Sequence, residues 1–233
     1  MSERSVSITF AGCLRGVRYC LPVLPGTVAF GAVFGTVCAQ KGLTFAETLL
    51  INSFVFAGAS QFVAMEVYQA QLTQGVILAM IGVTAAVNMR LLLIGASLRP
   101  WLGGVPSYQT YPSLFFLTDI NWLIALREYD KGERDWGIFL GSGVFIWIVW
   151  SCAVIPGYWA GSAVADPAKW GLDVILPAYF VALLVPLWKG KRQTVSWLAA
   201  GAVALITWFL VGGYWAILTG AMSGAVVGAF ADE

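Results

Sequence analysis

Long stretches without a charged side chain constrain this chain more than any other feature. Such runs of 18 residues or more include positions 19–40, 48–65, 67–89, 136–165 and 193–231. An apolar run of about 18 residues or more is typical of a helix that spans a membrane. Only 11% of the 233 residues are charged, against about 25% in soluble domains. We therefore predict an all-α integral membrane protein in which residues 1–233 form one transmembrane domain.

We expect about seven or eight transmembrane helices, some of them broken at Pro or Gly. Residues 1–20 mix apolar side chains with Arg15 and Arg18, so this segment lies on the cytoplasmic membrane surface or extends the first span. The last two spans are separated only by Gly212-Gly213, and they merge into one if these residues do not form a turn. The expected spans are 22–39, 47–66, 72–98, 112–126, 136–160, 172–188, 197–211 and 214–230.

The distribution of basic residues predicts the orientation in the membrane. If the N-terminus is cytoplasmic and 72–98 crosses once, the inner segments hold nine Lys and Arg residues and the outer loops hold three. If 72–98 crosses twice, the inner segments hold five and the outer loops eight. Because cytoplasmic loops are enriched in Lys and Arg, the distribution favours a single crossing and a cytoplasmic N-terminus.

Proline and glycine interrupt the start of the first span. Pro22, Pro25 and Gly26 fall there, and proline removes a backbone donor. A helix that restarts at Gly26 has free N–H groups and the positive end of its dipole, which bind substrate carboxylates in several transporter folds. The alternative is an ordinary helix start at the membrane interface, where proline is common.

The second span places polar residues inside an uncharged run. Residues 54–63 read FVFAGASQFV, with Ser60 and Gln61 near the middle. On a continuous helix, Ser60 lies in a seam of small residues that allows close helix packing. The alternative is a substrate site, because Ser60 and Gly26 both lie about 20 Å below the outer ends of their spans. At one shared level, N–H groups could bind a carboxylate and side-chain oxygens could bind an ammonium group.

An arginine within the third span also needs an explanation. Arg90 lies two residues after Asn88. Charged side chains inside a membrane span are usually functional or paired with another charge. Arg90 and Asp119 lie about 12 and 11 Å from the outer ends of their spans, so they can form an ion pair. The alternative is that Arg90 extends toward the interface and Asp119 caps a half-helix.

Several functions are excluded by what the sequence lacks. The chain has no histidine, and its four cysteines form no CxxC pair, so we expect no metal and no cofactor. Without histidine, and without a nucleophile elbow around Ser60 or Ser97, we expect no catalytic residues and no enzyme activity. A net charge of +1 without a basic stripe excludes a nucleic-acid partner.

The segments around Gly26, Ser60, Arg90 and Asp119 resemble those of the AzlC family of branched-chain amino acid permeases. "FAGASQF" followed by "NMR" and "GASL" is the most specific part of the resemblance, which extends over almost the whole chain. The matching segments are Pro25-Gly26, Ala29–Gly31, Phe56–Phe62, Asn88–Arg90, Gly95–Leu98, Thr118-Asp119, Gly171–Phe180 and Leu183–Pro186.

The resemblance implies the large subunit of an exporter with a smaller AzlD-type membrane subunit in the bacterial inner membrane. It also implies export of valine, leucine, isoleucine or methionine, driven by an ion gradient that we expect to be of protons. The alternatives are a structural or assembly subunit and a transporter of a different small solute. The candidate substrate-binding residues are Pro25, Gly26, Phe30, Gly58, Ser60, Gln61 and Asn88. Arg90 and Asp119 are the candidate coupling or structural ion pair.

The sequence departs from the family pattern at two positions beside this ion pair. The family commonly has a histidine directly after the arginine, where this chain has Leu91. It commonly has a glutamate directly after the aspartate, where this chain has Ile120. Both changes remove a titratable group and bear on whether protons drive transport here.

Overall fold

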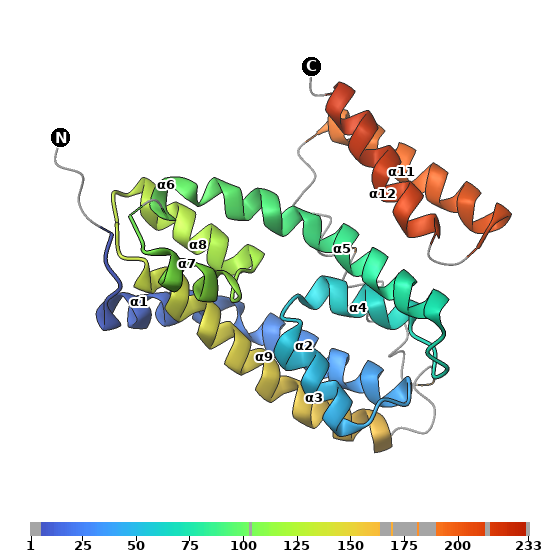
Figure 1. The fold of residues 1–233 in the computed structure, drawn as a ribbon, viewed down its shortest axis with the longest axis horizontal. Helices are drawn as coiled ribbons and strands as arrows, with labels where there is room; N and C mark the ends of the chain where they lie inside the picture. Colours follow the sequence, from blue (N-terminus) through green and yellow to red (C-terminus); the bar gives the residue numbers. More distant parts are fainter. Residues whose placement is uncertain are drawn as a thin grey trace. The chain divides into compact units, whose positions relative to one another are not determined.

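The computed structural model describes residues 6–102, 104–163, 169, 181, 190–212 and 215–231. These residues are helical apart from short connections and contain no strand, which confirms the all-α membrane class. The helices are α1 Phe10–Cys20, α2 Leu24–Gln40, α3 Phe45–Phe54, α4 Gly58–Val67, α5 Gln74–Ser97, α6 Arg99–Leu102, α7 Ser107–Leu114, α8 Asp119–Asp130, α9 Gly137–Ala163, α11 Lys191–Leu210 and α12 Trp215–Ala231 (Figure 1). Of the expected span 172–188, only residue 181 is among the described residues.

Three helical segments in the described part of the chain are long and apolar enough to cross a membrane. They are Phe10–Gln40, Gln74–Ser97 and Gly137–Ala163, and two shorter apolar helices cover Thr194–Leu210 and Trp215–Phe230. The chain divides into two compact units. Unit 1 contains residues 1–61 and 88–163, and unit 2 contains residues 62–87 and 164–233.

In unit 1, α1 and α2 run parallel to α9 (Figure 1). Gly16 lies against the backbone of Ile138, and Gly35 lies against Val154, so both chains advance in the same direction. Thr36 donates a hydrogen bond to the carbonyl oxygen of Gly157 (2.9 Å). Small residues let membrane helices approach this closely. The four-residue glycine spacing recurs along the contact, at Gly12, Gly16, Gly31 and Gly35 on one side and at Gly137, Gly141, Gly157 and Gly161 on the other.

The helix that was expected to restart at Gly26 does not do so. A 3₁₀ turn at Leu21–Val23 connects α1 to α2, and the residues that flank this turn have right-handed helical dihedrals. Pro22 and Pro25 each occupy the first turn of the helical segment that they begin, where a missing N–H is tolerated. The path from Phe10 to Gln40 is therefore helical throughout, so α1 extends the first span and the prediction of a free helix end at Gly26 is wrong.

The expected span 47–66 is instead broken in the middle. Thr44 caps α3 through a capping box with Glu47, and α3 ends at Phe54. Val55, with φ −116° and ψ 74°, leaves the helical region, and α4 begins only at Gly58. The proposed seam of small residues through Ser60 therefore does not run along one helix.

The expected span 112–126 is also two helices. Pro112 lies inside α7, which ends at Leu114. A new helix, α8, begins at Asp119, where Thr118 and Asn121 form a capping box. The predicted 72–98 segment, in contrast, is the single helix α5.

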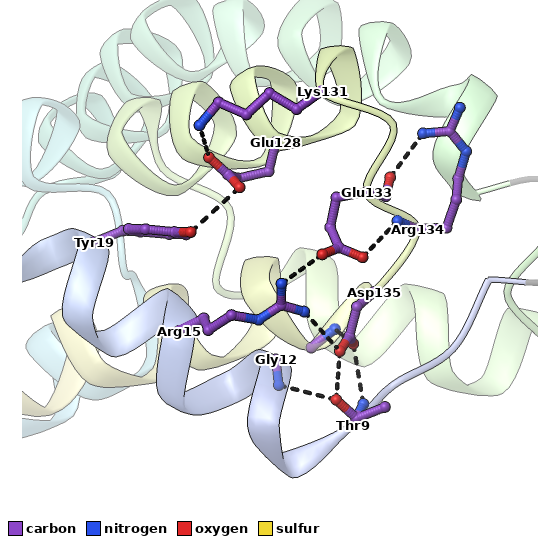
Figure 2. Close-up of polar contacts among 10 residues, drawn as sticks. Thr9, Gly12, Arg15, Tyr19, Glu128, Lys131, Glu133, Arg134 and Asp135 are labelled. Atoms are coloured by element: carbon purple, nitrogen blue, oxygen red, sulfur yellow. Dashed lines mark hydrogen bonds and ion pairs between the residues drawn. The ribbon is translucent and has the colours of Figure 1, made fainter.

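A charged cluster ties the start of α1 to the connection between α8 and α9 (Figure 2). Arg15 forms ion pairs with Glu133 and Asp135, and the hydrogen bond from Arg15 lowers the pKa of the Glu133 carboxyl. Asp135 also accepts hydrogen bonds from the Thr9 N–H and hydroxyl and from the Gly137 N–H. The carboxylate of Asp135 is buried and fully paired, so it serves to join α1 to α9.

Aromatic side chains fill the part of unit 1 next to this cluster. Trp136 stacks on Phe139, with ring centroids 4.2 Å apart, and its indole N–H donates to the hydroxyl of Ser113 (2.9 Å). The buried residues of this core are Leu98, Trp101, Leu117, Ala125, Trp136 and Phe139.

In unit 2, α11 and α12 pack together as an antiparallel hairpin (Figure 1). Gly220 faces Ala204, and Gly224 faces Ala200. The hydroxyl of Thr219 donates to that of Thr207 (2.9 Å). Gly212, with φ +73°, lies in the connection between the two helices, in a conformation that favours glycine.

Candidate functional site

The break between α3 and α4 leaves backbone donors without partners. The Ala57 N–H donates to the Val55 carbonyl (2.9 Å), and the Gln61 N–H donates to the Ala57 carbonyl (3.0 Å). Within the described residues, the N–H groups of Gly58, Ala59 and Ser60 have no acceptor. These groups carry the positive end of the α4 dipole and can receive an anion such as a carboxylate.

Aromatic rings from two other helices lie beside this helix start. Phe30 on α2 contacts Trp150 on α9 edge-to-face, with ring centroids 5.4 Å apart, and Phe34 stacks on the same indole at 6.1 Å. A Cβ atom placed on Gly58 would lie 3.2 Å from the Trp150 ring and 3.5 Å from the Phe30 ring. The absence of a side chain at Gly58 therefore keeps apolar surface close to the free N–H groups.

Two amide side chains are buried beside the break. Gln61 is 1% exposed and donates from Nε2 to the carbonyl of Ile51 (3.3 Å), while its Oε1 has no partner among the described residues. Asn52 is fully buried and donates from Nδ2 to the hydroxyl of Ser151 (2.9 Å), while its Oδ1 is likewise unpaired. The Trp150 indole N–H also lacks an acceptor there. Each unpaired buried polar group costs about 1–3 kcal/mol, which a bound polar ligand would offset.

The structure brings together four of the seven predicted substrate-binding residues. Gly58, Ser60 and Gln61 form the first turn of α4, and Phe30 faces Gly58. The Ser60 hydroxyl donates to the Ala57 carbonyl (2.9 Å), so its oxygen can still accept a hydrogen bond.

The other three predicted residues are not joined to this group. Pro25 and Gly26 are exposed on the first turn of α2, and no described atom beyond the adjacent helix backbone lies within 4 Å of a Cβ placed on Gly26. Asn88 is half-buried on α5, and no described contact links it to the break. The free N–H groups that were expected at Gly26 are found at Gly58 instead.

Arg90 and Asp119 lie together, as their matched depths suggested. Arg90 Nη2 is 3.0 Å from Asp119 Oδ2, and both side chains are about half exposed, at 47% and 52%. Asp119 is the first residue of α8, where the helix dipole favours a negative charge. Close by, the Trp122 indole N–H donates to the Ser97 hydroxyl (2.8 Å) and holds α8 against the end of α5.

The described residues do not gather three or more His, Cys, Asp or Glu side chains that could hold a metal ion. The unpaired groups at the break are all neutral: backbone N–H, amide oxygen and indole N–H. Such a set can bind a small zwitterion by hydrogen bonding, with aromatic surface for an apolar side chain.

Two important residues of this site were missed from the sequence. Asn52 and Gln61 are the two amides in the uncharged run 48–65, and that placement could have marked Asn52 as polar and buried. Its partner Ser151 is 99 positions away, and no local pattern predicts that pairing. Trp150 stands out in the sequence only as one of many aromatic residues, although it contacts both Phe30 and Phe34.

Comparisons with known proteins match the chain to one family profile and to several membrane proteins. A family profile described as AzlC protein matches residues 22–164. The Inner membrane protein YgaZ of Escherichia coli (strain K12) is 28% identical over 206 residues, which cover 85% of this chain and 82% of the relative. The Branched-chain amino acid transport protein AzlC of Bacillus subtilis (strain 168) is 23% identical over 198 residues, which cover 84% of this chain and 75% of the relative. No solved structure matches the chain.

Proposed function

The chain belongs to the AzlC family of membrane transport proteins, and on that premise we propose that it exports small apolar amino acids. The substrate class is branched-chain amino acids, as the name of the Bacillus subtilis relative states for that protein. Its multi-pass helical structure agrees with the membrane location in the names of its relatives. We place it in the bacterial inner membrane with a cytoplasmic N-terminus.

The observation that carries this proposal is the break between α3 and α4. An amino acid needs donors for its carboxylate, acceptors for its ammonium group and apolar surface for its side chain. Free N–H groups at Gly58–Ser60, the unpaired oxygen of Gln61 and the Phe30–Trp150 ring pair supply these three requirements around one helix start. Discontinuous helices bind substrate in this way in several transporter folds.

We assign coupling to the pair Arg90–Asp119. The carboxylate of Asp119 lies at a helix start beside its only described ion-pair partner, and an intramembrane carboxylate can carry a proton. Leu91 and Ile120 leave this pair without the neighbouring histidine and glutamate of the family pattern. The complete exporter contains this chain as its large subunit and a smaller AzlD-type membrane subunit.

Flux in membrane vesicles tests this function. The chain is co-expressed with the small subunit, and movement of radiolabelled valine and leucine is measured with and without an imposed pH gradient. We expect gradient-driven flux that is lost in Gln61→Ala. Flux of neither amino acid from a well-folded complex would contradict the proposed substrate, and flux that ignores the pH gradient would contradict proton coupling.

A further inference from the structure

The C-terminal end of α3 is as incompletely paired as the start of α4. The Val55 N–H donates to the Ile51 carbonyl, and the Ala57 N–H donates to the Val55 carbonyl. Within the described residues, the carbonyl oxygens of Asn52, Ser53 and Phe54 therefore accept no hydrogen bond. The end of a helix with free carbonyls carries partial negative charge and attracts cations.

Two buried side chains with an unpaired oxygen adjoin the last turn of α3: Asn52 belongs to it, and Gln61 donates to its Ile51 carbonyl. A carbonyl can only accept, so the contact with the Ile51 carbonyl requires the amide nitrogen of Gln61 and leaves Oε1 as the unpaired atom. Asn52, the next residue after Ile51, donates from Nδ2 to the Ser151 hydroxyl and leaves Oδ1 unpaired. Both side chains are at least 99% buried.

The oxygens near the α3 end are neutral. None of the described hydrogen bonds or ion pairs joins an acidic or basic side chain to Asn52 or Gln61. Divalent cations in proteins are usually held by carboxylates, whereas free carbonyls at a half-helix end coordinate Na⁺ in other transporters. The set therefore suits a group of single positive charge.

We propose that Asn52 Oδ1, Gln61 Oε1 and the carbonyl end of α3 bind a monovalent cationic group. Its source is the ammonium group of the substrate or a sodium ion. The ammonium case rests on the proposed transport of amino acids, and the sodium case does not. Asn52 is in either case a specificity-determining residue of the break.

The experiment uses the purified full-length chain with its small subunit. Asn52→Leu and Gln61→Leu each replace the side-chain amide, and with it the unpaired oxygen, by a branched apolar group. Ser151→Ala is the matched control, because it removes the hydrogen bond of Asn52 but retains both oxygens. Melting temperature is measured in choline chloride and in sodium chloride. Affinity is measured for valine and for its 2-oxo acid, which has the carboxylate and side chain but no ammonium group.

If sodium is the occupant, NaCl raises the melting temperature of the wild type and Ser151→Ala above that in choline, and both leucine variants lose this rise. If ammonium is the occupant, the leucine variants bind valine at least tenfold more weakly and bind the 2-oxo acid as the wild type does. A sodium effect without any amino-acid binding would retain the cation site and overturn the proposed substrate. Leucine variants that match the wild type in both measurements would overturn the cation site.

Discussion

At the residue scale, the segment 54–63 contains both satisfied and unsatisfied polar groups. The Ser60 hydroxyl is satisfied by the Ala57 carbonyl one turn away, which is a common local arrangement. The Gln61 oxygen and the N–H groups from Gly58 to Ser60 are not satisfied in the described structure. Buried polar groups are nearly always paired in folded proteins, which is why we propose that a ligand binds at these few unpaired ones.

Gly58 offers a test of the space beside the aromatic rings. We expect Gly58→Val to reduce transport of valine and leucine at least tenfold, because its side chain would occupy the space against Trp150 and Phe30. Overpacking of this kind costs about 1–3 kcal/mol, so the yield of folded protein is measured alongside vesicle flux. Ala59→Val adds similar bulk one residue later and should retain more flux; equal loss in both variants would contradict a site at Gly58.

Single and double variants can show whether the ion pair Arg90–Asp119 has a structural role or couples transport to protons. Either single variant, Arg90→Gln or Asp119→Asn, leaves one intramembrane charge unpaired, at a cost of about 2.5–3.5 kcal/mol, and should lower the yield of folded protein. The double variant should restore the yield because no charge remains, yet show no proton-driven flux. Restored flux in the double variant would mean that the pair is structural only.

At the element scale, the molecule combines rigid and interrupted helices. The segment from α1 to α2 packs along α9 at nearly backbone contact. The helices α3 and α4, and likewise α7 and α8, are short pieces separated by a few residues that do not continue the helix. Long helices with close packing provide a fixed support, while the interrupted ones expose backbone groups that can bind a ligand.

The close packing of α2 on α9 predicts a strong effect of glycine replacement. A Cβ atom on Gly35 would overlap the backbone carbonyl of Val154, which cannot move as a side chain can. We expect Gly35→Leu to abolish folded protein, measured by size-exclusion chromatography in detergent. Gly82→Leu is the control, since Gly82 is also helical but a Cβ atom placed on it would have no described atom within 4 Å. Comparable loss in both would mean that helix packing is not the cause.

At the scale of the whole molecule, the parallel direction of α2 and α9 limits the topology. If both helices cross the membrane, an odd number of crossings must separate them. One crossing each by 45–67, 74–97 and 107–130 meets this condition, whereas two crossings by 72–98 does not. The parallel packing therefore supports the single crossing by 72–98 that we infer from the basic residues.

Labelling with a membrane-impermeant maleimide tests this topology. In a chain whose four cysteines are replaced, we expect Lys41→Cys, just after α2, to react in intact cells. Lys131→Cys, which lies just before α9, should react only after the membrane is permeabilised. The reverse pattern would invert the proposed orientation. Reaction of both positions from the same side would contradict the parallel packing of α2 and α9 across the membrane.

The sequence by itself determined the membrane class, the approximate extent of the apolar helices α5, α9 and α12, and the presence of buried polar residues in 54–63. Charge-free runs and helix length are local properties, so they can be read directly. The tertiary structure decided that the helix breaks at 55–57 rather than at Gly26, that α9 runs parallel to α2, and that Asn52 bonds to Ser151. Those outcomes depend on which backbone and side-chain groups find partners on distant helices, and no local pattern contains that information.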